Sequence, residues 1–248
     1  MSKKTVAIIP ARSGSKSIPH KNIKIFRDKP LIAHSILQAC QLKDDGLLDD
    51  IFVSTDSHEY QIISEKWGAR VPFLRPPEIS GDNSTDYEFL KHFIDWKVNN
   101  EPDSLPDTII QFRPTYPGRS YKIIRDIYQT FMNNYDNYDS LRTVVPIEKT
   151  PYKMYHMNGD HLIPIFKTGP NGINEPYNIG RQLLPPSYLH NGYLDIIKTD
   201  TILKKNSITG DSIYGYIMNE NEIDDIDYES DWIRAEKVDM SLEINIEN

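Results

Sequence analysis

The chain of 248 residues contains a single cysteine, Cys40. One cysteine excludes an internal disulfide and fits a reducing compartment, so we expect a cytoplasmic protein. No apolar stretch approaches the roughly 20 residues that a membrane-spanning helix needs. The apolar run after Lys3 and Lys4 is too short for the hydrophobic region of a signal peptide, and it ends in a charged loop. The sequence therefore predicts no association with a membrane.

The chain also lacks an excess of positive charge. Its net charge of −8 argues against a general binder of nucleic acid or of anionic membranes. Residues 1–30 nevertheless hold eight basic residues and one acidic residue, whereas residues 220–248 hold eleven acidic and two basic residues. The first segment suits phosphates and the second suits a divalent cation, although two unrelated surfaces would give the same asymmetry.

Strand and helix patterns alternate through the first 145 residues. Apolar runs predict the strands, and apolar residues at helical spacing predict the helices between them. This alternation favours an α/β fold with a mostly parallel, doubly wound (Rossmann-like) sheet, whose ligands bind beyond the carboxyl ends of the strands. The predicted strands are residues 5–9, 51–53, 71–74, 108–112 and 140–145, and the predicted helices are residues 30–42, 58–67, 85–98 and 120–133. Thr85 and Glu88 have the spacing of a capping box at the start of the third helix.

The alternation stops between Pro146 and Pro186, where short segments are rich in turn residues. We expect an irregular or β-hairpin excursion from the sheet there, which could serve as an oligomer contact. The α/β pattern then resumes with strands over 193–197 and 213–218, a short helix near Thr201 and a last helix over 230–238. The chain is predicted to be one domain, 1–248, with an insert around 146–186.

The first candidate for chemistry is the N-terminal loop, Arg12-Ser13-Gly14-Ser15-Lys16, followed by Lys21-Asn22. It lacks the GxxxxGK[ST] pattern of a P-loop and the GxGxxG pattern of a dinucleotide site. Its small residues still allow backbone N–H groups to face phosphate oxygens, and Arg12, Lys16 and Lys21 add positive charge. An ordinary exposed polar loop would have the same composition, so the loop alone leaves both interpretations open.

The second candidate is Asp225-Ile226-Asp227. Residues two apart in an extended segment project to the same side, so both carboxylates could hold one hard cation such as Mg²⁺. Taken alone, the motif is more typical of a solvated acidic surface. Arg181-Gln182 and Asn191-Gly192 are potential ligand contacts, or turn residues. No GxSxG nucleophile elbow is present, and the seven histidines show no metal-ligand spacing with each other or with Cys40.

Taken together and in order, these stretches resemble the acylneuraminate cytidylyltransferase family (CMP-sialic acid synthetases and relatives). The resemblance implies a nucleotidyltransferase that joins CTP and a nine-carbon α-keto acid sugar into a CMP-sugar, with release of pyrophosphate. The sugar's anomeric hydroxyl would attack the α-phosphorus. The stretches that carry the resemblance are Ile9 to Lys16 with Lys21-Asn22, Val53 to Asp56, Arg75 to Glu78 with Asp82 to Thr85, Pro114 to Pro117, Arg181-Gln182, Asn191-Gly192 and Asp225 to Asp231.

The resemblance also implies roles for individual residues and a homodimer with the excursion at its contact. The nucleotide would be bound by Arg12, Ser15, Lys16, Asn22, Arg75 and Ser84. Asp225 and Asp227 would hold Mg²⁺, and Arg181, Lys21 and Asp227 would be catalytic. Arg113, Gln182 and Asn191 would contact the sugar.

Two departures from the family leave the sugar open. Arg113 stands where many sialic acid enzymes have glutamine, and Tyr193-Leu194-Asp195 follows Asn191-Gly192 in place of small and aromatic residues. The acceptor could be a legionaminic or pseudaminic type of acid, or another ulosonic acid. Kdo is not expected, because the enzymes that activate Kdo have a different loop. Two alternatives remain: a nucleotidyltransferase for another sugar or NTP, and a non-catalytic nucleotide-binding homologue.

Overall fold

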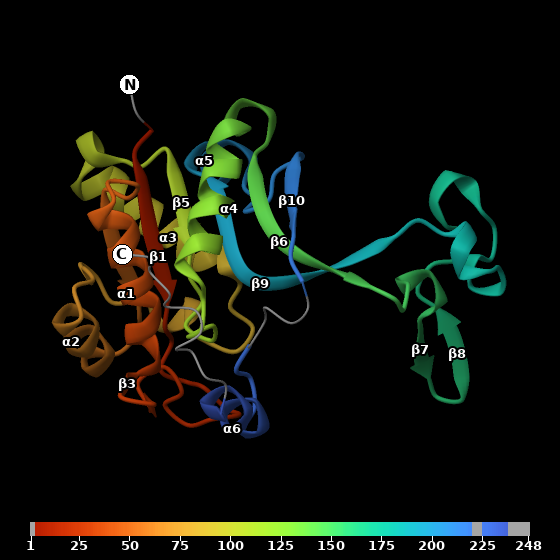
Figure 1. Cartoon of the computed structure of the whole chain (residues 1–248), viewed down its shortest axis with the longest axis horizontal. Coiled ribbons are helices and arrows are strands. Elements are labelled where there is room, and N and C mark those ends of the chain that lie inside the picture. The colour runs from red at the N-terminus through yellow and green to blue at the C-terminus, as the bar shows by residue number, and fades with distance from the viewer. Residues whose placement is uncertain (1–2, 220–224, 238–248) are drawn as a thin grey trace. The chain divides into compact units, whose positions relative to one another are not determined.

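The computed structural model describes residues 3–219 and 225–237 (Figure 1). The chain divides into two compact units. The first comprises residues 1–142, 192–216 and 223–248, and the second comprises residues 143–191 and 217–222. The predicted excursion, 146–186, lies within the second unit.

A six-stranded sheet contains all the predicted strands except the one over residues 71–74. Its order is β10 (Ile213–Ile217), β6 (Ser140–Ile147), β9 (Ser187–Lys198), β5 (Thr108–Gln111), β1 (Thr5–Pro10) and β4 (Asp50–Ser54). β1 pairs in parallel with both β4 and β5, and β9 pairs antiparallel with β5. β1 and β5 are buried almost throughout because they lie inside the sheet. The mostly parallel sheet of an α/β fold is confirmed.

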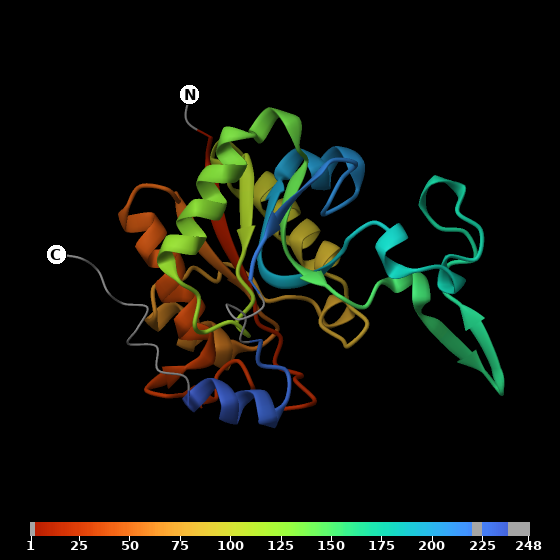
Figure 2. The ribbon, with the colours of Figure 1, turned by 45° about the vertical axis from the view of Figure 1, so that its right-hand side comes forward.

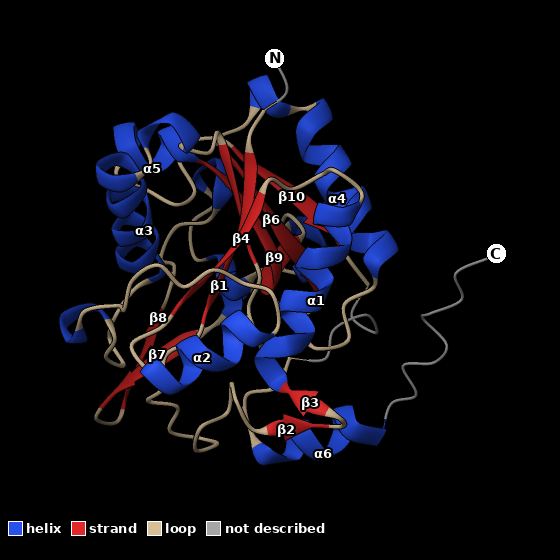
Figure 3. Ribbon diagram, turned by 90° about the vertical axis from the view of Figure 1, so that its left-hand side faces the viewer, coloured by secondary structure: helices blue, strands red, loops and turns tan. Residues whose placement is uncertain are grey.

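Helices cover both faces of this sheet (Figure 3). On one face α1 (Leu31–Asp44) contacts β1, β4 and α4 (Tyr121–Asn133), and α2 (His58–Lys66) packs on α1. On the other face α3 (Asp86–Asn100) contacts α5 (Thr199–Lys205). The last described helix is α6 (Glu229–Lys237). The doubly wound arrangement is therefore confirmed. No helix in the described ranges combines the length and apolarity needed to cross a bilayer.

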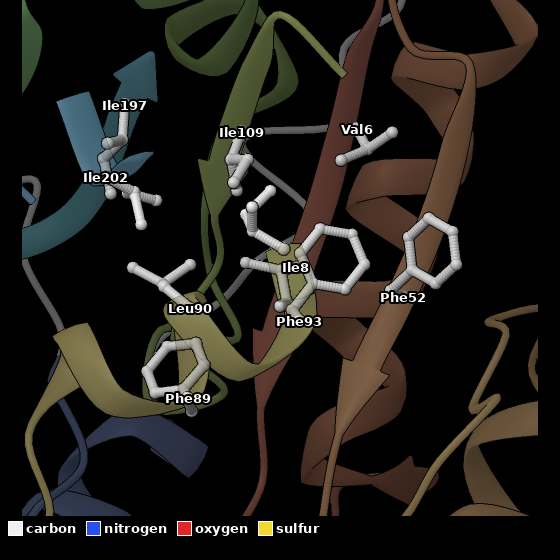
Figure 4. Close-up of a cluster of buried hydrophobic side chains, with 10 residues drawn as sticks. Val6, Ile8, Phe52, Phe89, Leu90, Phe93, Ile109, Ile197 and Ile202 are labelled. Carbon is white, nitrogen blue, oxygen red and sulfur yellow. The ribbon is translucent and has the colours of Figure 1, made fainter. Parts of the chain in front are cut away.

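The α3 face of the sheet carries a buried apolar cluster (Figure 4). Val6 and Ile8 of β1 pack with Phe93 of α3, and the rings of Phe52 and Phe93 have their centroids 4.9 Å apart. Burial of each such side chain contributes about 1.5–3 kcal/mol. The start of α3 has the predicted capping box, in which Thr85 and Glu88 bond each other's backbone N–H. Packing and cap together fix where α3 begins, and the candidate pocket lies at that point.

The second unit confirms the expectation of an irregular or β-hairpin segment. Strands β7 (Tyr155–Asn158) and β8 (His161–Pro164) form an antiparallel hairpin. Short 3₁₀ turns make up much of the rest, one of them at Arg181–Leu183. Large apolar side chains remain exposed on the hairpin, with Met157 at 61% and Leu162 at 59%.

The strand predicted over residues 71–74 is wrong. Arg70 forms an isolated bridge with Phe52, and the next residues are in no strand. Pro72 has no N–H to donate to a β ladder, which gives the physical reason. The segment instead runs along the end of β4, where the backbone N–H of Arg75 donates to Thr55 O at 2.7 Å. Two strands of two residues each, β2 (Ile25–Phe26) and β3 (Lys29–Pro30), were not predicted.

Candidate active site

A pocket of about 590 Å³ lies in the first unit, beyond the carboxyl ends of β1 and β5. We call it the main pocket. Four segments line it: the residues after β1, the residues before α3, the residues after β5 and the residues before α6. Its lining includes ten of the residues that the sequence singled out, namely Arg12, Ser15, Lys16, Lys21, Asn22, Arg75, Ser84, Arg113, Asp225 and Asp227.

The N-terminal loop is fixed to the end of β4 by Asp56. The backbone N–H and the hydroxyl of Ser13 each donate to the Asp56 carboxylate at 2.8 Å. The buried side chain of Asn22 donates to Arg12 O at 3.0 Å and closes the loop from its other side. Asp56 was part of a recognised motif but was not predicted as a site residue, since sequence alone does not show that it faces Ser13.

Asp82 binds the two cations of the N-terminal loop. Arg12 Nη1 lies 2.7 Å from Asp82 Oδ1, and Lys16 Nζ contacts Asp82 Oδ2. Lys16 and Arg12 hold the pKa of Asp82 below its ordinary value. Arg12 and Lys16 therefore present a positive region with a carboxylate on it, which an anionic ligand would have to displace.

Lys21 joins the N-terminal part of the site to the segment before α6. Its side chain is largely buried, and its Nζ donates to Ile226 O at 2.7 Å and lies 3.3 Å from Asp227 Oδ1. Ser17 Oγ donates to Asp227 O at 2.6 Å. These bonds bring together segments that are about two hundred residues apart in sequence.

Ile226 orients the two carboxylates beside it. It is fully buried in an apolar cluster with Ile18, Phe26, Leu31, Trp232 and Ala235. Figure 2 shows α6, in blue, lying against the red and orange segment that precedes α1. Because alternate side chains of an extended segment point to opposite sides, burial of Ile226 directs Asp225 and Asp227 toward the main pocket.

Asp225 and Asp227 fit a hard divalent cation. Burial, with a further contribution from the Asp227 carboxylate, raises the pKa of Asp225. Asp225 Oδ1 is buried and has no hydrogen-bond partner in the part of the chain that the structure describes. No group of three or more His, Cys, Asp or Glu side chains within 3–219 and 225–237 could hold a metal. Mg²⁺ commonly binds one or two carboxylates together with water and substrate phosphate, so a pair suffices.

Arg75 also lines the main pocket. It is 6% exposed, and its Nε and Nη2 donate to the side chain and the carbonyl of Ser54 at 3.1 and 2.7 Å. Burial lowers the pKa of Arg75 to about 10. Its Nη1 makes no hydrogen bond within the described residues, and Ser84 and Ser15 line the same pocket.

Arg113 lines the main pocket, but its charge is already matched. Its Nη1 lies 2.7 Å from Asp195 Oδ2 and its Nη2 lies 2.6 Å from Asp86 Oδ2. Burial acts to lower the pKa of Arg113, but Asp195 and Asp86 outweigh it and raise that pKa. Asp86 also lines the pocket and was not predicted, because it reads from sequence as an ordinary first-turn residue of a helix.

Three predicted residues lie in the second unit and do not line the main pocket. Arg181 and Gln182 line a pocket of about 310 Å³ together with Glu148 and Thr150. Asn191 Oδ1 accepts a bond from Thr143 Oγ1 at 2.6 Å. The roles given to these residues stay predictions.

Comparison with known proteins agrees with this geometry. A family model described as cytidylyltransferase matches residues 6–157, more than half of the chain. The N-acylneuraminate cytidylyltransferase of Streptococcus agalactiae serotype V is 32% identical over 235 residues, which cover 94% of this chain and 52% of that protein. The chain thus spans about half the length of this relative.

A further relative matches over nearly its full length. The CMP-N,N'-diacetyllegionaminic acid synthase of Legionella pneumophila is 30% identical over 247 residues, covering 98% of this chain and 97% of that protein.

Solved structures share the fold. A CMP:2-keto-3-deoxy-manno-octonic acid synthetase in complex with CTP superposes with a TM-score of 0.63 at 14% identity, covering 94% of this chain and 97% of that one. A 4-diphosphocytidyl-2C-methyl-D-erythritol synthase gives 0.62 at 11% identity, covering 95% and 98%. The family model covers more than half of the chain, and the Legionella relative matches it over nearly its full length. The sheet order is compatible with both matches. The chain therefore belongs to the cytidylyltransferase family.

Proposed function

We propose that the chain transfers a cytidylyl group from CTP to a nonulosonic, sialic-acid-like sugar, giving the CMP-sugar and pyrophosphate. One observation carries the proposal: Lys21 connects the cationic N-terminal loop to the carboxylates of Asp225 and Asp227 within one pocket. A triphosphate needs cations along its length, and transfer at its α-phosphorus needs charge neutralisation and alignment more than covalent help.

The N-terminal loop would hold the triphosphate. Arg12 and Lys16 would exchange Asp82 for phosphate oxygens, and Lys21, already held by Ile226 O, would place a fixed charge beside them. Arg75, with Asn22, Ser15 and Ser84, would bind the rest of the nucleotide. Because Asp56 and Asn22 fix the loop beforehand, the loop would lose little conformational entropy when the nucleotide binds.

The reaction forms a bond between the anomeric oxygen and the α-phosphorus and breaks the bond from that phosphorus to pyrophosphate. Asp225 and Asp227 would hold Mg²⁺, which would neutralise phosphate charge and acidify the attacking hydroxyl. Asp227, which is exposed on the pocket wall, would receive the proton of that hydroxyl.

The names of the relatives support a nonulosonic acceptor. They include an N-acylneuraminate enzyme, a diacetyllegionaminic acid enzyme and the pseudaminic acid cytidylyltransferase of Campylobacter jejuni, which is 30% identical over 163 residues. We assign Arg113, Gln182 and Asn191 to the acceptor, and Arg181 to catalysis near it. Pairing of Arg113 with Asp86 and Asp195 favours a contact different from that of a neutral glutamine.

We also propose a cytoplasmic homodimer that forms through the second unit. Met157 and Leu162 leave apolar surface on the β7–β8 hairpin, and apolar patches of this kind are typical of interfaces. Light scattering should give twice the mass of the chain, and Leu162→Lys should give the mass of a monomer. A monomeric wild-type protein at micromolar concentration would contradict the dimer.

A pyrophosphate-release assay with CTP, Mg²⁺ and a panel of nonulosonic acids tests the function, with the product identified by mass spectrometry. We expect turnover with one or more of these sugars, and loss of turnover in Asp227→Ala with the fold retained. Turnover with another NTP, or tight CTP binding without turnover by any sugar, would instead support one of the two alternatives. Thermal shift with each NTP identifies the preferred nucleotide independently of turnover.

A further inference from the structure

The turn after β5, residues 113–117, is held by side chains that donate to its carbonyl oxygens. Arg119 Nη2 donates to Arg113 O at 2.6 Å, and Arg119 Nη1 donates to Tyr116 O at 2.7 Å. From α1, Ser35 Oγ donates to Arg113 O at 3.3 Å and Gln38 Nε2 donates to Pro117 O at 2.8 Å. Three of the five carbonyls of this turn therefore accept hydrogen bonds from side chains outside it.

Arg119 is the centre of this network. It is 5% exposed, and its Nε donates to Tyr193 O at 2.6 Å. Its Nη1 also donates to Ser35 Oγ and Gln38 Oε1, both at 3.1 Å. No carboxylate pairs with it anywhere in the described ranges, and the rings of Phe112, Tyr116 and Tyr193 lie within 5.5 Å of its guanidinium carbon.

A buried cation without a carboxylate partner carries a desolvation cost that an apolar side chain of similar volume avoids. A role in filling space alone therefore does not explain why an arginine is buried at position 119. A guanidinium differs from an apolar group in its rigid fork of donors, which here joins the carbonyls of Arg113 and Tyr116 in one geometry.

The same turn holds Asp225. Ile226 N donates to Thr115 O at 2.9 Å, and the side chains of Thr115 and Tyr116 hydrogen-bond the Asp225 carboxylate. Pro114 and Thr115 line the main pocket, whereas Arg119 does not. A continuous path of bonds therefore runs from Arg119 through the turn to Asp225.

We propose that Arg119 is a positioning residue, which acts through the turn after β5 to set the placement of Asp225 in the main pocket. This inference rests on the proposed function, in which Asp225 and Asp227 hold a divalent cation. If Arg119 only supported the fold, its loss would lower stability and leave cation affinity unchanged.

Titration of the full chain with Mn²⁺ alone, followed by the electron paramagnetic resonance of free Mn²⁺, tests this without turnover. Arg119→Lys keeps the charge and loses the fork, and we expect at least a fivefold rise in the Mn²⁺ dissociation constant. Tyr116→Phe removes only the hydroxyl on Asp225 and should shift the constant in the same direction. In the assay of activity, both variants should need more Mg²⁺ for half-maximal rate, with a smaller change in the KM for CTP.

Lys97→Met is the matched control, since Lys97 is 2% exposed, bonds Glu101 and Ser104, and does not line the main pocket. It should lower the melting temperature and leave Mn²⁺ affinity unchanged. If Arg119→Lys and Tyr116→Phe bind Mn²⁺ within twofold of wild type, the positioning role is wrong and the proposed function stands.

If Arg119→Lys does not fold, Tyr116→Phe and Ser35→Ala decide, because Ser35 bonds both Arg119 and Arg113 O. Unchanged affinity in both would overturn the proposal. A wild-type chain that binds no Mn²⁺ would overturn the cation assignment of the proposed function and the role of Arg119 with it.

Discussion

Asp82 is bonded to both cations that the N-terminal loop would offer to phosphate, so it competes with the nucleotide. Asp82→Asn should therefore lower the KM for CTP. Exposed ion pairs contribute about 0–1 kcal/mol each, so the expected change is about two- to tenfold. Initial rates of pyrophosphate release at varied CTP measure it. Asp95→Asn is the control, since Asp95 pairs with Lys91 on α3 and neither residue lines the pocket. A raised KM in Asp82→Asn would show that Asp82 helps to bind the nucleotide.

Arg113 neutralises Asp195, whose side chain is 2% exposed. Arg113→Gln should lower the free energy of unfolding by about 1.5–3 kcal/mol, because the Asp195 carboxylate loses a charged hydrogen bond and keeps the more distant Arg142 guanidinium, whose Nε lies 3.8 Å from Asp195 Oδ1. The double variant Arg113→Gln with Asp195→Asn should recover much of that loss. Urea denaturation of the three proteins measures both effects. Equal stability of wild type and Arg113→Gln would mean that the Asp195 carboxylate does not depend on Arg113, since Arg142 also faces it.

At the scale of elements, α6 holds Asp225 and Asp227 through Trp232. That side chain packs edge-on against Phe26 with ring centroids 5.3 Å apart, in the cluster that buries Ile226. Trp232→Ala should reduce the stability with which α6 packs on its apolar cluster by about 3–5 kcal/mol. We expect the sheet to persist in far-ultraviolet circular dichroism while stabilisation by CTP and Mg²⁺ in thermal shift is lost. Ile233→Ala, which is on the exposed side of α6, should behave as wild type. If CTP and Mg²⁺ still stabilised Trp232→Ala, the packing of α6 would not be needed for ligand binding at the site.

Long periodic elements could be predicted from the sequence, and short ones could not. The apolar spacing of 30–42 and the Thr85–Glu88 box identified α1 and α3 because both signals are local. Residues 71–74 carry apolar residues that serve packing without pairing, since Pro72 prevents a ladder. The two-residue strands β2 and β3 are too short to show a period of two.

At the scale of the whole molecule, the sequence predicted that the carboxyl ends of the strands lie at one crevice. It did not predict which side chains pair with each other in that crevice. Strand order and family resemblance together brought Arg12, Lys21 and Asp225 to one crevice, as the structure has them. Asp82, Asp86 and Arg119 were missed as partners because a polar pair between distant segments leaves no local pattern. The positions of Arg181, Gln182 and Asn191 in the second unit likewise depend on a boundary that no composition change marks.

Global stability should fall below neutral pH through His34, which is buried, and His92, which is partly buried. Burial lowers the pKa of His34 and of His92 from the ordinary value of 6.5. As pH falls through 6.5, the unfolded chain takes up protons that the folded chain does not, so the free energy of unfolding decreases. Urea midpoints at pH 7.5 and 5.5 measure the difference, which should be smaller in His34→Gln. A urea midpoint that rises between pH 7.5 and pH 5.5 would contradict this role of the histidines. So would a difference between the two midpoints that is as large in His34→Gln as in wild type.

The bonds from Lys21 to Ile226 and Asp227 also bear on how the protein is made. A ribosome delivers the N-terminal loop and strands β1, β4 and β5 long before residue 225, so the site stays incomplete until residues 225–227 are synthesised. Until then Ile18, Phe26 and Leu31, which Ile226 and Trp232 later cover, face solvent. A nascent or truncated chain that ends before residue 225 thus exposes an apolar surface and a basic loop together. We expect such a chain to be a client for chaperones and proteases, and nucleotide binding would report that synthesis has passed the segment before α6.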